Sequence, residues 1–342
     1  MHHIIYILLF LPLGLSAQIP DGYYDNAEGL KAEELKAALY NIIKGHTAYP
    51  YTGSSTDVWD ILKESDRDPN NSANVILFYT GWSVNGAQEY NDNTGWNREH
   101  VWAKSHGAFD TGDIPGRDAH HLRPTDITVN GKRDSRWFDD GGTAYTDGDG
   151  ATGCFYSDAN YTWEPREAVK GDVARIIFYM ANRYEGENGE PDLEVIDYFP
   201  ADDHTSEPVH ALLSTLLEWH DLDPVDAFEE NRNNVIYGYQ HNRNPFIDHP
   251  EYVDYIYRDN TGIQDKASDI LSQQLVFPNP AKTIIELRGK DSFNKSYIIT
   301  NILGNAVKQG KLADSQIINI ENLPKGLYLL YINNTVIKFL KV

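Results

Sequence analysis

The stretch GWNREHVWAKSHG, from Gly95 to Gly107, places the acid Glu99 directly before the imidazole of His100. Two tryptophans, two basic residues and a second histidine, His106, lie in the same thirteen residues. In a regular strand, consecutive side chains point to opposite faces, so Glu99 and His100 could serve one ligand only at a strand end or a bulge. The stretch therefore predicts a reactive site where a strand ends.

Two further blocks rich in charged residues and histidines follow closely. They are DAHHLRPT, from residue 118, and NGKRDSR, from residue 130. Thirty residues separate His100 from Asn130, which is enough chain for a strand, a loop, a return strand and the start of a helix. We therefore expect the three blocks to meet at one site. The candidate residues of the two later blocks are His120, His121, Arg123, Asn130, Lys132, Arg133 and Arg136.

These residue types match the needs of phosphodiester hydrolysis. A water must lose a proton near neutral pH, where imidazole titrates, and His100 can accept it. A hard cation such as Mg²⁺ or Ca²⁺ prefers oxygen ligands, and Glu99 and Asn130 offer a carboxylate and an amide oxygen. The arginines and the lysine of the later blocks could neutralise phosphate.

The blocks NREHVWAKSHG, DAHHLRPT and VNGKR resemble the signature blocks of the endonuclease I family, the secreted ββα-metal (His-Me finger) nucleases. The resemblance is closest to the cysteine-poor members, among them secreted bacterial ribonucleases. It extends to GDVARIIFYMANRY and NRNPFIDHPE, and so covers most of Asp21 to Tyr257. It implies a nuclease that acts on nucleic acid, either DNA or RNA or both, without sequence preference.

The resemblance also implies roles for single residues. Glu99 and Asn130 would hold one divalent cation, with Mg²⁺ expected and Ca²⁺ or Mn²⁺ as alternatives, and His100 would activate water. Arg133 would lie beside the metal-binding asparagine and meet phosphate. The remaining candidates would support the site or bind phosphate: His120, His121, Arg123, Lys132 and Arg136.

The chain departs from the family in two ways. Cys154 is its one cysteine, whereas disulfide-bonded members have several. The loop between Gly107 and Asp118 is short, and it has no secure equivalent of the arginine that stabilises phosphate in longer members. Arg117 matches that arginine by position alone, so the cation that neutralises the transition state stays open.

Composition and charge divide the 342 residues into two domains. The net charge is −22, yet the residues from Val276 onward carry +5, which leaves −27 for the rest. We expect a signal peptide at residues 1–17, a nuclease domain at 18–262, a linker at 263–274 and a small β-sandwich at 275–342. The segments VFPNPA, NILGNAV and LPKGLYLLYI resemble the sorting domain of type IX secretion, which implies export to the surface or the medium through that machinery.

Hydrophobic periodicity predicts an α+β, helix-rich first domain followed by an all-β sandwich. The resemblance implies that the first domain is a nuclease built around a ββα core. We expect helices within residues 25–46, 164–186 and 208–224, and a helix within 55–65 that Ser55 or Thr56 caps. We also expect at least one more helix within 224–257, and a strand at 74–81 that Gly81 closes. The Asp- and Gly-rich segment 139–150 is interpreted as a solvated loop, with a calcium loop as its alternative. No stretch beyond the signal peptide is long enough to span a membrane, and we expect a monomer.

Other readings of the same residues stay open at this point. The protein could be an extracellular adhesion or polysaccharide-binding module without catalysis, or a hydrolase of a small phosphodiester. Trp96 and Trp102 could stack on bases, although core packing is the commoner use of such residues. His106 is expected on the surface or in packing, and Arg175 in a buried ion pair. Of His120 and His121, we expect one to pack inside and one to face the site.

Overall fold

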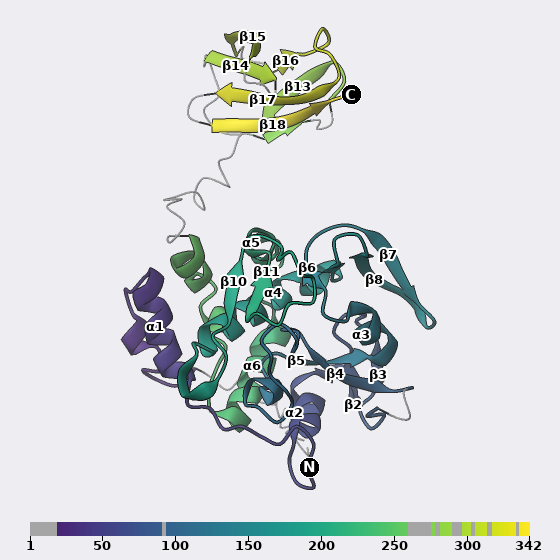
Figure 1. Cartoon of the computed structure of the whole chain (residues 1–342), viewed down its shortest axis with the longest axis vertical. Coiled ribbons are helices and arrows are strands. Elements are labelled where there is room, and N and C mark those ends of the chain that lie inside the picture. The colour runs from purple at the N-terminus through teal and green to yellow at the C-terminus, as the bar shows by residue number, and fades with distance from the viewer. Residues whose placement is uncertain are drawn as a thin grey trace, which may run out of the picture. The chain divides into compact units, whose positions relative to one another are not determined.

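A computed structural model describes residues 19–90, 94–258, 275–277, 281–288, 296–301, 305–312, 317–332 and 335–342 of the chain. The chain divides into two units, Met1–Gly262 and Ile263–Val342 (Figure 1). The predicted signal peptide and the predicted linker lie outside the described residues.

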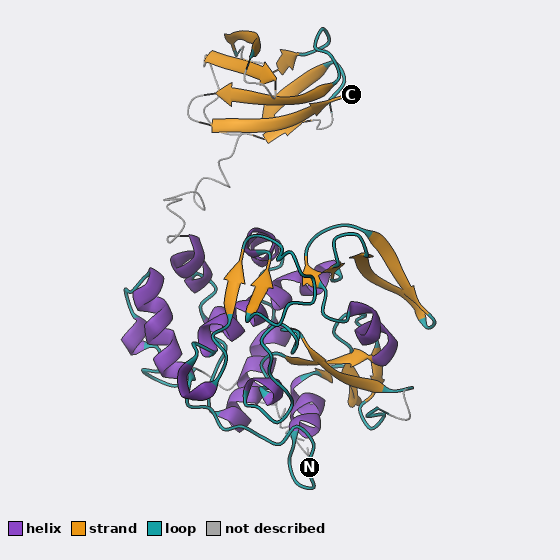
Figure 2. Cartoon of the chain, viewed as in Figure 1, coloured by secondary structure: helices purple, strands orange, loops and turns teal. Residues whose placement is uncertain are grey.

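In the first unit, more residues lie in helices than in strands (Figure 2). The central one is α4 (Lys170–Arg183), of which every residue is buried. Its sequence predicts one apolar face, but α4 is surrounded on all sides, and its polar residues are buried in ion pairs and hydrogen bonds. The other α-helices are α1 (Ala32–Ile43), α2 (Val58–Ser65), α3 (Ile127–Arg133), α5 (Leu213–Leu222), α6 (Ala227–Gln240) and α7 (Pro245–Asp248). Short 3-10 turns are η1 (Asp25–Ala27), η3 (Pro115–Arg117), η4 (Glu167–Val169) and η5 (Glu187–Gly189), and η6 (Asp254–Arg258) is a π-helical turn.

The ββα element is formed by β4 (Trp96–His100), β5 (Leu122–Asp126) and α3. The two strands are antiparallel, and their register places Glu99 opposite Arg123 and His100 opposite Leu122. Asp126 ends β5 and caps α3, because its carboxylate accepts hydrogen bonds from the backbone amides of Thr128 and Val129. His100 ends β4, and a loop, the return strand β5 and the first part of α3 lead from it to Asn130. The spacing between the two residues predicts this order.

Short sheets surround this element in the first unit. One has the order β1-β2-β3, formed by Arg67–Asp68, Asn71–Ile76 and Ser83–Asn85. A second has the order β6-β9-β8-β7, formed by Trp137–Phe138, Thr162–Glu164, Gly150–Ser157 and Thr143–Asp147. A parallel pair joins β10 (Glu194–Ile196) to β11 (Val209–Ala211).

Two local predictions were wrong. Residues 139–150 were expected to be a loop, but they include β7 and the start of β8, which pair as an antiparallel hairpin. Helix α2 is capped by Asp57, and not by Ser55 or Thr56, because Asp57 and Asp60 form a reciprocal capping box. Both cases depend on hydrogen-bond partners that local composition does not specify.

The second unit is a β-sandwich, as predicted. One antiparallel sheet has the order β12-β13-β16, formed by Leu275–Phe277, Ile284–Arg288 and Ile317–Asn319. The other has the order β15-β14-β17-β18, formed by Ala306–Lys311, Ser296–Asn301, Gly326–Ile332 and Thr335–Lys341. Their shared core includes Ile285, Ile299, Leu330 and Phe339. Within the described residues of both units, no helix combines the length and the apolar character needed to cross a membrane.

Candidate active site

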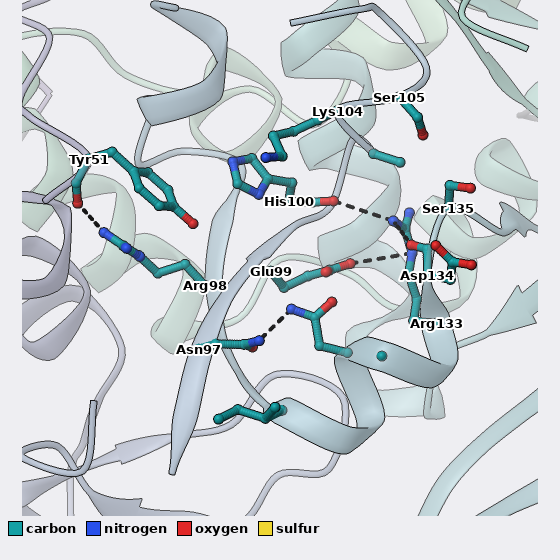
Figure 3. A pocket seen from close by; sticks show the side chains of 14 residues that line it. Tyr51, Asn97, Arg98, Glu99, His100, Lys104, Ser105, Arg133, Asp134 and Ser135 are labelled. Carbon is teal, nitrogen blue, oxygen red and sulfur yellow. Dashed lines mark hydrogen bonds and ion pairs between the residues drawn. The ribbon is translucent and has the colours of Figure 1, made fainter. Parts of the chain in front are cut away.

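The end of β4, the loop that follows it and one face of α3 line a pocket of about 510 Å³ (Figure 3). Its lining includes Asn97, Glu99, His100, Lys104, Asn130 and Arg133. His100 is the last residue of β4, so the pleat ends there and consecutive side chains can reach the same pocket. The Glu-His pair therefore lies at the end of a strand, as the sequence predicts.

The His100 ring is held in one protonation pattern. Its Nε2 donates to the backbone oxygen of Gly116 at 2.9 Å. Because a carbonyl oxygen only accepts hydrogen bonds, the proton is on Nε2, and Nδ1 keeps a free lone pair. Tyr51 stacks on the ring, with 5.6 Å between centroids. Burial, aided by the nearby His121, lowers the pKa of His100 well below its usual value, so the ring is neutral at pH 7.

Gly116 allows this contact because it has no side chain. A Cβ at this position would lie 1.9 Å from the backbone oxygen of Asp110, so no other residue fits without moving the loop. The glycine thus closes the loop tightly and brings its carbonyl oxygen to His100.

Glu99 is a buried residue, 2% exposed, and one of its carboxylate oxygens contacts Tyr79 and Arg133. Its Oε1 accepts a hydrogen bond from the Tyr79 hydroxyl at 2.8 Å and lies 3.3 Å from Nε of Arg133. Burial raises the pKa of Glu99, while Arg133 and the Tyr79 hydrogen bond act in the opposite direction. The second carboxylate oxygen, Oε2, takes part in neither of these two contacts.

Asn130 offers a second oxygen. It lies on α3, and its Nδ2 donates to Oδ1 of Asn97 at 2.9 Å. The bond fixes which end of the amide is free, so Oδ1 of Asn130 remains available at the pocket. The pocket thus joins a neutral imidazole to two oxygen donors of the type that hard cations prefer.

Comparison with known proteins shows the family to which the chain belongs. Residues 31–251 match the family model of endonuclease I. The chain belongs to the endonuclease I family. It is 52% identical over 242 residues to the extracellular ribonuclease of Bacillus subtilis (strain 168), an alignment that covers 69% of this chain and 78% of the relative. It is 51% identical over 236 residues to the extracellular ribonuclease of Bacillus amyloliquefaciens, with the same 69% and 78% coverage.

A second family model matches the C-terminal unit. Residues 275–341 match the model of the secretion system C-terminal sorting domain. The protein is therefore a nuclease with a nucleic acid substrate, and it is secreted or displayed on the cell surface. Its membership of the endonuclease I family decides against an adhesion module without catalysis.

The geometry of the endonuclease does not fit the prediction that Arg133 contacts phosphate. Arg133 is 1% exposed, and its guanidinium donates to the backbone oxygens of His100, Val101 and Asp134 while pairing with Glu99. These contacts use its donors within the protein. Arg133 instead fixes the end of β4 and the orientation of the Glu99 carboxylate.

Arg123 and the two adjacent histidines lie behind the pocket. Arg123 is buried between Asp66 and Asp172, at 2.8 and 3.1 Å, so its place favours support of the site over phosphate contact. We expected one of the histidines to face the site, but both are buried: Nε2 of His120 donates to a backbone oxygen of residue 242, and Nε2 of His121 to that of residue 115. Neither is among the pocket's lining residues.

Lys132 and Arg136 point to the β7–β8 hairpin. Both contact Asp158, at 3.4 and 2.5 Å, and both lie over the ring of Tyr156.

A cluster of three aspartates also lies at this hairpin. Carboxylate oxygens of Asp126, Asp147 and Asp149 lie within 4.8 Å of one another. The carboxylates of Asp126 and Asp147 accept hydrogen bonds from protein donors.

Sequence reasoning missed several residues of the site. Tyr79, which orients Glu99, and Tyr51, which stacks on His100, come from segments before the motif. Nothing in their local sequence marks them. Lys104 could have been found, because it lies four residues after His100 in the quoted stretch. Trp96 and Trp102 are fully buried, so they pack in the core and do not stack on bases.

Proposed function

We propose that the protein is a metal-dependent, sequence-nonspecific endonuclease that hydrolyses the phosphodiester bonds of RNA, with His100 as general base. The hydrogen bond from Nε2 of His100 to Gly116 carries the proposal, because it leaves Nδ1 as a neutral proton acceptor at the pocket. The names of the two Bacillus relatives, both extracellular ribonucleases, favour RNA as substrate.

The residues present fit a divalent cation. Oε2 of Glu99 and Oδ1 of Asn130 would hold it, and the remaining positions would be left for water and phosphate oxygens, as Mg²⁺ prefers. A cation bound there supplies positive charge to the phosphate and to the leaving oxygen. Tyr79 and Arg133 keep the Glu99 carboxylate oriented, and Asn97 does the same for the Asn130 amide.

The chain's own residues then carry out the proton transfer. Nδ1 of His100 takes a proton from a water molecule while the oxygen of that water attacks phosphorus. The bond from phosphorus to one bridging oxygen breaks, and the leaving oxygen takes a proton from solvent. Stacking on Tyr51 and the Gly116 contact hold the ring during this step.

Digestion of a long RNA and of plasmid DNA tests the proposal. Wild-type protein with Mg²⁺ should degrade RNA, and EDTA should stop the reaction until Mg²⁺ is restored. His100→Ala should lower the rate by roughly 10²- to 10⁴-fold, the range expected for loss of a general base. His204→Ala, at an exposed histidine outside the pocket, is the control and should keep wild-type activity.

Full activity of His100→Ala would refute the assignment of the base, and full activity in EDTA would refute the metal requirement. Equal cleavage of plasmid DNA would contradict the restriction to RNA.

A further inference from the structure

Three cationic side chains line the pocket, and their partners differ. They are Arg98, Lys104 and Arg133. The guanidinium of Arg98 donates to the Tyr51 backbone oxygen and to the Thr52 hydroxyl. It also lies over the aromatic ring of Tyr51 at 3.4 Å. Arg98 is therefore fixed in the pocket wall.

Arg133 is also held in place by contacts within the protein. Its donors face three backbone oxygens and the Glu99 carboxylate, and it is almost completely buried. Moving this side chain toward a ligand would leave buried acceptors unpaired, which is costly. Neither arginine can thus turn toward an incoming phosphate at small cost.

Lys104 is in a different situation. It lies on the loop after β4, its side chain is 37% exposed, and its recorded ion pair among the described residues is with Asp110 at 3.5 Å. Asp110 is itself 82% exposed, and ion pairs between exposed groups are weak. The ammonium can therefore exchange this partner for another anion at little cost.

The side chain of Lys104 also lies at the catalytic end of the pocket. Lys104 and His100 line the same cavity, and Lys104 follows His100 by four residues. Figure 3 shows its side chain turned toward the imidazole. A phosphate attacked by water at His100 would lie close enough for the Lys104 ammonium to contact it.

We propose that Lys104 is the phosphate-binding cation of this site: on substrate binding it leaves Asp110 and contacts a non-bridging oxygen of the scissile phosphate. The inference rests on the proposed function, because it needs the reaction to occur at His100. Lys104 then neutralises charge that grows on the phosphate during attack. Asp110 holds the ammonium in the free enzyme and competes with the substrate for it.

The kinetics of purified full-length variants on RNA test this role. Lys104→Met should lower kcat/KM by about 10- to 100-fold, and it should reduce the slope of log kcat/KM against log salt by about one, the value for one lost phosphate contact. Lys104→Arg should retain most of the activity, because it keeps the charge. Asp110→Asn should raise kcat/KM by about two- to fivefold at low salt, since the competing anion is gone.

Lys44→Met is the matched control. Lys44 is 38% exposed and pairs with Glu187 at 3.5 Å, so it repeats the exposure and ion pair of Lys104 away from the pocket. Its kcat/KM and salt slope should equal those of the wild type. The proposal is overturned if Lys104→Met matches Lys44→Met in both quantities.

His100→Ala, run in parallel, separates the two hypotheses. If His100→Ala is inactive while Lys104→Met is fully active, the role of Lys104 fails and the proposed function stands. If His100→Ala is fully active, the proposed function itself fails.

Discussion

The hydrogen bond between Asn97 and Asn130 makes a prediction about cation binding. Oδ1 of Asn97 accepts from Nδ2 of Asn130 at 2.9 Å, and this bond decides which end of the Asn130 amide faces the pocket. Asn97→Ala removes the acceptor but keeps the backbone pairing of β4 with β5 at this position. The amide of Asn130 can then rotate, and its oxygen is no longer held ready for a ligand.

The size of the effect follows from the bond that is lost. A neutral hydrogen bond contributes about 0.5–1.5 kcal/mol, which corresponds to roughly 2- to 13-fold in affinity. Loss of a group that orients a metal ligand typically costs about 10- to 100-fold in metal affinity or activity. We therefore expect Asn97→Ala to need about tenfold more Mg²⁺ for half-maximal RNA cleavage. At saturating Mg²⁺ the rate should return close to that of the wild type.

The assay is the initial rate of RNA cleavage across a Mg²⁺ series, with circular dichroism as the check on folding. Asn97→Asp is the matched variant, because it keeps an acceptor for Nδ2 and adds a negative charge. Its half-maximal Mg²⁺ concentration should be equal to that of the wild type or lower. A folded Asn97→Ala protein with the wild-type Mg²⁺ dependence would refute the orienting role of the bond.

Three further predictions follow from buried groups. Tyr79→Phe removes the hydroxyl donor to Glu99 and should raise the half-maximal Mg²⁺ concentration by about 2- to 13-fold; an unchanged Mg²⁺ titration would contradict it. Arg175→Met leaves its buried carboxylate partner on α6 unpaired and should lower the free energy of unfolding in urea by about 3–5 kcal/mol; a loss below about 1 kcal/mol would exclude this. Burial lowers the pKa of both His120 and His121 to about 4, so protons bind the unfolded chain first as the pH falls below 6.5. Each should remove about 2 kcal/mol of stability between pH 7 and pH 5, and equal urea midpoints at the two pH values would refute it.

The ββα core and the meeting of its key residues could be predicted from the sequence. The spacing between the Glu-His pair and the Asn130 block leaves room for a loop, a return strand and the start of a helix. The resemblance to the family implies the ββα element that brings them together. The residues that orient them could not be predicted. Tyr79 and Tyr51 reach the site through tertiary packing, which leaves no periodic signal in their own segments.

The errors have a common physical cause. Charge in the sequence suggests phosphate contact, but burial decides whether a guanidinium is available. Arg133 is enclosed by the Glu99 carboxylate and by backbone oxygens, whereas Lys104 remains exposed. In the same way, residues 139–150 resemble a solvated loop by composition, yet they pair as a hairpin because β8 provides a neighbouring strand.

Gly116 ties two functions to one position in the loop. Its carbonyl sets the tautomer of His100, and its bare α-carbon packs against the backbone of Asp110, the counter-ion of Lys104. A side chain at this position would therefore disturb proton acceptance and charge neutralisation together. Length changes elsewhere in the loop should be tolerated only when they return this glycine to the same place.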